Sequence, residues 1–182
     1  MVSKRYISPL ELHRLSFDLG MKIIKDGFKP TWIIALWRGG CPVGMSVQGL
    51  FKYHGCDADH ISVRTSSYNT EGTQQSEIRV HGLEYVVKNM KSTDTVLLVD
   101  DVFDSGRSVK ALIDKMQRKL RNNFPQDLKI ATVFYKPQNN KTSLSPDYYC
   151  EVTDEWIVFS HEFEDLNKDE IKDFMGFNIE SL

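Results

Sequence analysis

The chain has 182 residues, which predicts one domain with enough length for a sizeable core. Hydrophobic residues make up 41% of it and charged residues 26%, so a mostly disordered chain is excluded. The 23 basic and 25 acidic residues lack the basic excess typical of nucleic-acid binders, although a small site for a phosphorylated ligand remains compatible with this balance.

The first half of the chain predicts two helices and two strands. Ser8 is a typical N-cap before a proline, Glu11 completes a capping box, and Gly27 is a typical stop. The apolar run TWIIAL has the character of a short buried strand, and Arg38-Gly39-Gly40 ends it. Helices are expected from Pro9 to Gly27 and from Pro42 to about Tyr53, and strands at 31–36 and 60–64.

Residues 65–81 form a polar stretch that is rich in Ser, Thr, Asn and Gly. Few residues in it could join a core, so we expect one long loop. A loop of this length inside a compact domain is commonly functional or disordered.

The second half predicts apolar strands that alternate with helices. Strands are expected at 95–100, 129–134, 148–152 and 156–159, with a helix after Gly106 and a short final helix capped by Asn167. This alternation predicts an α/β fold with a parallel, twisted sheet that helices flank on both faces. In such sheets ligands bind at the carboxyl ends of the strands.

The most informative motif is TVLLVDDVFDSGRS, from Thr95 to Ser108. An apolar strand brings two adjacent carboxylates, Asp100 and Asp101, to the sheet edge, and Asp104 follows. The Ser-Gly turn and the helix start expose backbone N–H groups, which together form a site for an anion such as phosphate. Carboxylates beside it can bind a vicinal diol or face a hydrated Mg²⁺. A phosphate next to a diol suggests a ribose phosphate.

This segment resembles the signature of type I phosphoribosyltransferases, which bind phosphoribosyl pyrophosphate (PRPP). The resemblance implies a type I fold with a small base-binding hood, formed by the N-terminal segment and about residues 137–182. It also implies that Asp104 is the catalytic general base. The residues implied to bind the ribose and the 5′-phosphate are Asp100, Asp101, Asp104, Ser105, Gly106, Arg107 and Ser108.

Two further segments resemble pyrophosphate-binding parts of the 6-oxopurine salvage members of that family. Arg38 and Gly39 stand where the family's first loop binds pyrophosphate; glycine lets the backbone approach the anion and arginine supplies a forked cation. Ser67 and Tyr68 resemble the Ser-Tyr of a mobile loop that closes over PRPP and excludes water.

The base site is implied by a lysine and a hydrophobic strand. Lys136 resembles the lysine that reads the purine, because its donors match an oxo group at C6 and reject the amino group of adenine; Lys141 is a competing candidate. Trp156 and Ile157 resemble residues that contact the purine. Glu162 falls where relatives carry an aspartate near the metal.

The resemblance therefore implies a magnesium-dependent glycosyltransferase that moves 5-phosphoribose from PRPP to a 6-oxopurine and releases pyrophosphate. Hypoxanthine, guanine and xanthine are not ranked, because they differ at C2. The implied Mg²⁺ ligands are Asp100, Asp101 and Glu162. Relatives are commonly homodimers or homotetramers.

Two other classes of protein share parts of this pattern. A regulator that senses PRPP or a nucleotide would share the fold but lack turnover. A phosphoacceptor receiver domain also carries an Asp-Asp pair, normally near its N-terminus rather than in mid-chain.

The three cysteines bear on the location of the protein. Cys41, Cys56 and Cys150 form no CxxC and favour neither disulfides nor zinc, so a reducing cytoplasm is expected. No apolar run approaches a membrane span or a signal peptide.

Overall fold

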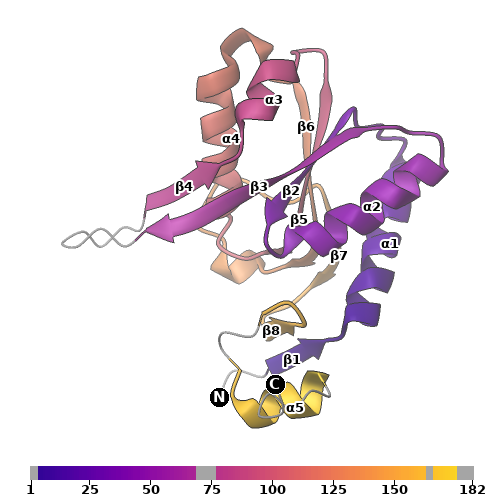
Figure 1. The fold of residues 1–182 in the computed structure, drawn as a ribbon, viewed down its shortest axis with the longest axis vertical. Helices are drawn as coiled ribbons and strands as arrows, with labels where there is room; N and C mark the ends of the chain where they lie inside the picture. Colours follow the sequence, from indigo (N-terminus) through magenta and orange to yellow (C-terminus); the bar gives the residue numbers. More distant parts are fainter. Residues whose placement is uncertain (1–3, 69–76, 163–165, 176–182) are drawn as a thin grey trace.

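A six-stranded sheet forms the centre of the computed structural model, which describes residues 4–68, 77–162 and 166–175. The strand order is β4-β3-β2-β5-β6-β7, and all neighbouring pairs are parallel except β3 and β4 (Figure 1). The expected α/β class with a parallel sheet is confirmed. The strands are β2 (Trp32–Trp37), β3 (Asp59–Tyr68), β4 (Glu77–His81), β5 (Thr95–Phe103), β6 (Asp127–Tyr135) and β7 (Tyr148–Val152).

Helices cover both faces of this sheet and enclose two apolar cores. On one face Leu19 of α1 and Val47 of α2 share a buried cluster with Leu97 of β5. On the other face α4 packs Leu112 and Met116 against the sheet. The helices are α1 (Pro9–Asp26), α2 (Gly40–Tyr53), α3 (Glu84–Asn89) and α4 (Arg107–Leu120), with short 3₁₀ turns at Arg121–Asn123 and Pro137–Asn139.

The N-cap and the C-cap of α1 agree with the predictions, except for one contact of Glu11. Ser8 Oγ accepts a hydrogen bond from the Glu11 backbone N–H at 3.2 Å, and Gly27 takes the left-handed conformation with φ of 83°. The predicted capping box is wrong in its second half, because the Glu11 carboxylate turns to Arg5, at 3.3 Å. An ion pair with a forked cation replaces the backbone contact there.

The prediction of a loop over residues 65–81 is wrong at both ends. The strand β3 continues to Tyr68, and β4 pairs with it antiparallel, with Thr65 opposite Val80. Val80 is buried while His81 is exposed, so β4 alternates as an edge strand with one covered face does. The sequence prediction also missed β1 and α3, which are both short.

A second, smaller body lies beside the main sheet. The strands β1 (Lys4–Ile7) and β8 (Trp156–Phe159) form a parallel pair, and α5 (Lys168–Met175) lies next to them (Figure 1). The expected start of α5 is confirmed, because the Glu170 N–H donates to Asn167 Oδ1 at 2.9 Å while the Asn167 N–H donates to Glu170 Oε2 at 3.0 Å.

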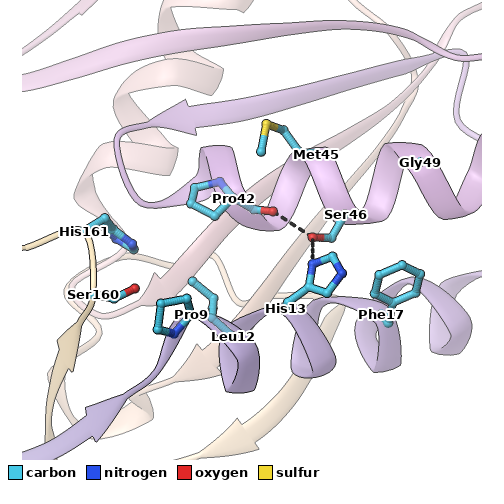
Figure 2. Close-up of a pocket in the computed structure, with 10 residues that line it drawn as sticks. All are labelled: Pro9, Leu12, His13, Phe17, Pro42, Met45, Ser46, Gly49, Ser160 and His161. Atoms are coloured by element: carbon cyan, nitrogen blue, oxygen red, sulfur yellow. Dashed lines mark hydrogen bonds between the residues drawn. The ribbon is translucent and has the colours of Figure 1, made fainter. Parts of the chain in front are cut away.

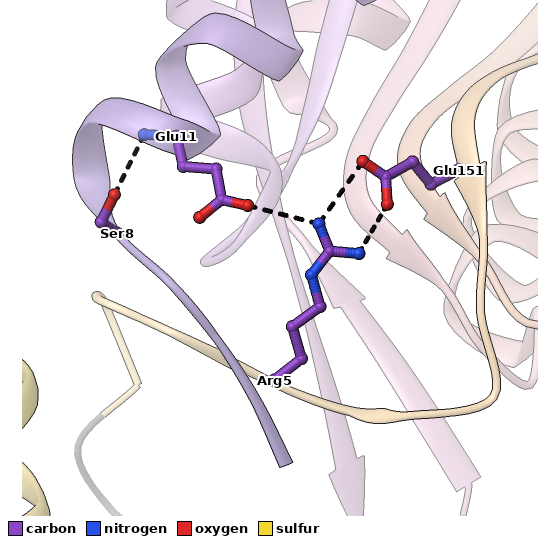
Figure 3. Close-up of polar contacts among 4 residues, drawn as sticks. All are labelled: Arg5, Ser8, Glu11 and Glu151. Carbon is purple, nitrogen blue, oxygen red and sulfur yellow. Dashed lines mark hydrogen bonds and ion pairs between the residues drawn. The ribbon is translucent and has the colours of Figure 1, made fainter. Parts of the chain in front are cut away.

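Arg5 joins this small body to the main one (Figure 3). Its guanidinium lies 2.5 Å from Glu151 of β7 and 3.3 Å from Glu11 of α1, and it sits over the ring of Phe134 at 5.2 Å from the centroid. In the β1–β8 pair, Arg5 stands opposite Ile157. One side chain thus links the strand that pairs with β8 to two elements of the main body.

The contacts of Glu170 predict a measurable pH effect at α5. Its hydrogen bond with Lys4, at 2.6 Å, and those with the Asn167 N–H and Tyr6 lower the pKa of Glu170 to about 2. A depressed carboxyl pKa stabilises the fold above the ordinary pKa, and that stabilisation is lost as the pH falls towards about 2. In a carboxyl-carbon NMR titration at low salt, Lys4→Met should raise the Glu170 midpoint towards its ordinary value, and Lys4→Arg should not. Equal midpoints in parent and Lys4→Met would contradict this.

Candidate functional site

Most of the residues singled out by the sequence lie at the carboxyl ends of β2, β5 and β6, whereas Trp156, Ile157 and Glu162 lie on or after β8. Strand β5 carries Asp100 and Asp101, and the turn between β5 and α4 carries Asp104 and Ser105. A cavity of about 220 Å³ lies against this turn. Its lining consists of Asp100, Asp101, Val102, Phe103, Asp104, Ser105, Gly106, Ser108 and Val109.

The turn before α4 requires its glycine. Gly106 has a φ of 72°, and a Cβ placed there would lie 2.7 Å from both the Phe103 ring and Thr142 Oγ1. The Lys141 N–H donates to the Ser105 carbonyl at 3.0 Å, so the segment after β6 fastens the outer side of the turn. The turn therefore presents the N-terminus of a 14-residue helix to the cavity, as an anion site requires.

The loop after β2 presses directly onto the acidic pair. A Cβ on Gly39 would collide with the Asp101 carboxylate, and one on Gly40 would collide with the Val99 carbonyl oxygen. Only glycine fits at these two positions. Arg38, which is exposed, follows a cis peptide bond from Trp37. The backbone between β2 and α2 consequently lies against the acids at the end of β5.

The two adjacent acids have different surroundings. Burial, followed by the nearby Asp101 carboxylate, raises the pKa of Asp100 well above its ordinary value. Asp101 is buried and lies 3.1 Å from His161, between Oδ2 and Nε2. Burial and then Asp101 raise the pKa of Glu162, while His161 and Arg38 act in the opposite direction.

Among the described residues, one cluster has donor atoms placed for a cation. Single atoms of Asp101, His161 and Glu162 all lie within 4.8 Å of one another. Two carboxylates and an imidazole fit a divalent cation of the Mg²⁺ or Mn²⁺ type. Of the three expected metal ligands, this grouping joins Asp101 and Glu162 and leaves out Asp100. His161, which lies 60 residues from Asp101, was not predicted as a metal ligand.

Lys136 lies near both Asp104, the predicted general base, and Trp156 of β8. Its side chain is buried, with Nζ 3.8 Å from Asp104 Oδ2 and 5.8 Å from the centroid of the Trp156 ring. The Lys141 side chain, in contrast, is exposed. Trp156 is 50% exposed and Ile157 is buried behind it. A lysine, a carboxylate and a half-exposed indole thus lie close to one another.

The remaining predicted residues lie at the end of β3 and at the start of α4. Ser67 and Tyr68 belong to the end of β3, opposite Ile78 and Glu77 in the register with β4. Their side chains lie outside the described part of the structure, as do residues 69–76, so the assignment to a closing loop stays a prediction. Ser108 lies in the first turn of α4 together with Arg107, which is exposed.

A larger cavity, of about 440 Å³, lies between α1 and α2 (Figure 2). His161 and Ser160 border one end, and Phe17 and Met45 line the apolar walls. The hydroxyl of Ser46, deep in the groove, bonds to His13 and to the Pro42 carbonyl, each at 3.0 Å. Ser46 and His13 therefore satisfy each other within the chain.

Comparison with known proteins decides the family. The model of the phosphoribosyl transferase domain matches residues 11–168. The chain belongs to this family. The resemblance seen in the motif of β5 is therefore confirmed, and the family consists of transferases of the glycosyltransferase type. The part of the chain that the structure describes contains no helix both long and apolar enough to cross a membrane.

Individual relatives agree with this membership. A hypoxanthine-guanine phosphoribosyltransferase from Streptococcus mutans is 29% identical over 143 residues, which cover 78% of this chain and 74% of the relative. A purine phosphoribosyltransferase from Pyrococcus horikoshii is 28% identical with a TM-score of 0.67, over 91% of this chain and 99% of that one. A hypothetical protein from Neisseria gonorrhoeae, with ppGpp bound, has a TM-score of 0.75 over 97% of both chains; at 20% identity it shows the fold alone.

Proposed function

We propose that the chain transfers the 5-phosphoribosyl group from PRPP to a 6-oxopurine and releases pyrophosphate. The observation that carries this proposal is the position of Lys136 Nζ, 3.8 Å from Asp104 and 5.8 Å from the Trp156 ring centroid, beside the helix N-terminus that follows β5. Lys136 can donate to the base, Asp104 can accept its proton, and the helix N-terminus can bind a phosphate close to both. The names of the relatives from Streptococcus and Pyrococcus support the same substrate class.

PRPP would lie along the ends of β2 and β5. The 5′-phosphate accepts hydrogen bonds from the Ser105-Gly106 turn and from the first turn of α4, where Ser108 adds a hydroxyl. Asp100 and Asp101 accept from the ribose hydroxyls. The pyrophosphate lies over the loop of Arg38 and Gly39, whose guanidinium stabilises the charge that develops on departure.

In the transfer step the bond from ribose C1 to pyrophosphate breaks and a bond from C1 to the purine nitrogen forms. The ribosyl centre becomes cationic in between, and the carboxylates of Asp100 and Asp101 stabilise it. Asp104 takes the proton that the purine loses, while Lys136 donates to the oxo group at C6. Trp156 supplies a surface on which the base stacks, which supports the view of β1, β8 and α5 as the base-binding hood.

Asp101 and Glu162 would hold the Mg²⁺, and their oxygen donors fit it. A bound Mg²⁺ supplies positive charge that neutralises the pyrophosphate and fixes its orientation. Gly39 packs against the Asp101 carboxylate and so keeps that ligand in place.

The proposal is tested by incubating the chain with PRPP, Mg²⁺ and one of four bases: hypoxanthine, guanine, xanthine or adenine. We expect a nucleoside monophosphate from at least one 6-oxopurine and none from adenine. If PRPP binds but no base yields a nucleotide, the alternative of a PRPP- or nucleotide-sensing regulator replaces the proposal. Adenosine monophosphate as the sole product would contradict the role of Lys136.

The link made by Arg5 yields a prediction for the base site. Arg5→Met removes the ion pairs to Glu151 and Glu11 and frees β1, which holds Ile157 and Trp156 in register. Partly exposed pairs contribute about 1 kcal/mol, so the KM for the purine should rise roughly fivefold while the KM for PRPP stays unchanged. Steady-state kinetics check this, with Lys4→Met as the control for a general change in β1. An equal rise in both KM values would contradict the link.

We further propose that the chain works in the cytoplasm as a homodimer or homotetramer. Large apolar side chains are exposed on α2 and at the end of β2, with Met45 72% and Trp37 53% exposed. Light scattering on the purified chain tests this, and a monomer at micromolar concentration would contradict it.

A further inference from the structure

His161 is held rigidly against one of the predicted metal ligands. Its Nε2 lies 3.1 Å from Asp101 Oδ2, and its ring stacks on Phe159 with centroids 5.1 Å apart and planes 12° apart. Asp101 is fixed in turn, because its Oδ1 accepts from the Val102 N–H at 2.7 Å. Neither group can turn away without losing these contacts, so the pair is preorganised.

The second nitrogen of His161, Nδ1, lacks a partner within the described part of the chain. Nδ1 is buried and has no hydrogen-bond partner among the described residues. A histidine that only orients a carboxylate normally has both ring nitrogens satisfied. When Nε2 of a histidine binds an ion, Nδ1 carries the proton and needs a partner of its own, and a water molecule beside the ion would supply one here.

We propose that His161 is a nitrogen ligand of the divalent cation that Asp101 and Glu162 hold, and that the site therefore prefers Mn²⁺ or Co²⁺ to Mg²⁺. Adjacent ligands of an octahedral ion with bonds of about 2.0–2.2 Å stand roughly 2.8–3.1 Å apart. The 3.1 Å between His161 Nε2 and Asp101 Oδ2 falls in that interval. All three donor atoms lie within 4.8 Å of one another. Asp101 also lines the cavity at the end of β5, which gives an ion a route to the cluster.

The donor set explains the preference among metals. Magnesium favours oxygen ligands, whereas an imidazole nitrogen contributes more to binding of Mn²⁺ and Co²⁺. Nε2 must carry no proton when it binds the ion, so the neutral imidazole binds in the tautomer whose proton is on Nδ1. This inference rests on the proposed function only in placing the cation beside the pyrophosphate.

The test is Mn²⁺ binding by the full chain, without PRPP or base, followed by electron paramagnetic resonance. Spin-echo modulation from ¹⁴N reports a coordinated imidazole directly. We expect this modulation in the parent and in His54→Gln, whose histidine is exposed and distant, and its loss in His161→Gln. Glutamine can still donate to Asp101, so the change separates coordination from orientation. The Mn²⁺ affinity should fall about tenfold in His161→Gln, with a smaller change for Mg²⁺.

Two results would overturn the inference. One is Mn²⁺ bound without nitrogen modulation, or with modulation that survives His161→Gln; His161 would then only orient Asp101. The other is no saturable Mn²⁺ binding below millimolar concentrations, either alone or with pyrophosphate added. Phosphoribosyl transfer measured on the same preparation with Mg²⁺ separates these outcomes from failure of the proposed function, since transfer persists if only the nitrogen ligand is wrong.

Discussion

Asp104→Asn should lower the rate of nucleotide formation by about 10²- to 10⁴-fold while the chain still binds PRPP. Asparagine keeps the size and one acceptor of the aspartate but cannot take the purine proton. The side chain of Asp104 is 45% exposed at the turn after β5 and lies 3.8 Å from Lys136 Nζ, so it is accessible to a base bound beside Lys136. Single-turnover experiments measure the rate of nucleotide formation, and calorimetric titration measures the affinity for PRPP.

The matched control for this variant is Asp114→Asn. Asp114 lies on α4, paired with Lys110 at 2.8 Å on the surface, so its loss should leave turnover within about twofold. A rate for Asp104→Asn close to that of the parent would remove Asp104 from the role of general base. A parallel loss of PRPP affinity would assign it to sugar binding instead.

Lys136→Met should lower kcat/KM for hypoxanthine by about 10²- to 10³-fold. A charged donor to the oxo group at C6 contributes about 1.5–3 kcal/mol, and its removal also leaves that oxygen unpaired in the site. Methionine keeps most of the apolar stem beside Trp156, so the loss reports the ammonium group rather than the packing.

Lys141→Met is the control that distinguishes the two lysines considered for the base site. The Lys141 backbone holds Ser105 and its side chain is exposed, so the variant should keep kcat/KM within about twofold of the parent. If Lys141→Met lost activity and Lys136→Met kept it, the assignment of the base reader would be reversed. Discrimination against adenine should fall in Lys136→Met in parallel with the loss for hypoxanthine.

The main sheet and the acidic turn were predictable because their signals are local. The run from Val96 to Val99 is continuously apolar, as a strand covered on both faces requires, and Gly106 supplies the positive φ that the turn needs. The caps at Ser8 and Asn167 likewise depend on contacts within three residues. Such features can be read without knowledge of the fold.

The parts that were missed depend on distant partners. Strand β1 has four residues, and it is a strand because Arg5 pairs with Ile157, far along the chain. The hairpin of β3 and β4 has a polar exposed face, so its composition matched a loop although Ile78 and Val80 alternate with polar residues. His161 lies beside Asp101 because the fold brings the end of β8 next to the end of β5, which the sequence alone does not reveal.

The most direct test of the account measures PRPP loss, pyrophosphate release and nucleotide formation together in one time course. With hypoxanthine and Mg²⁺, the account predicts equal amounts of all three from the start, and with adenine no nucleotide. Loss of PRPP without a matching nucleotide, or a nucleotide formed from adenine, would contradict the proposed transfer to a 6-oxopurine at the carboxyl end of β5.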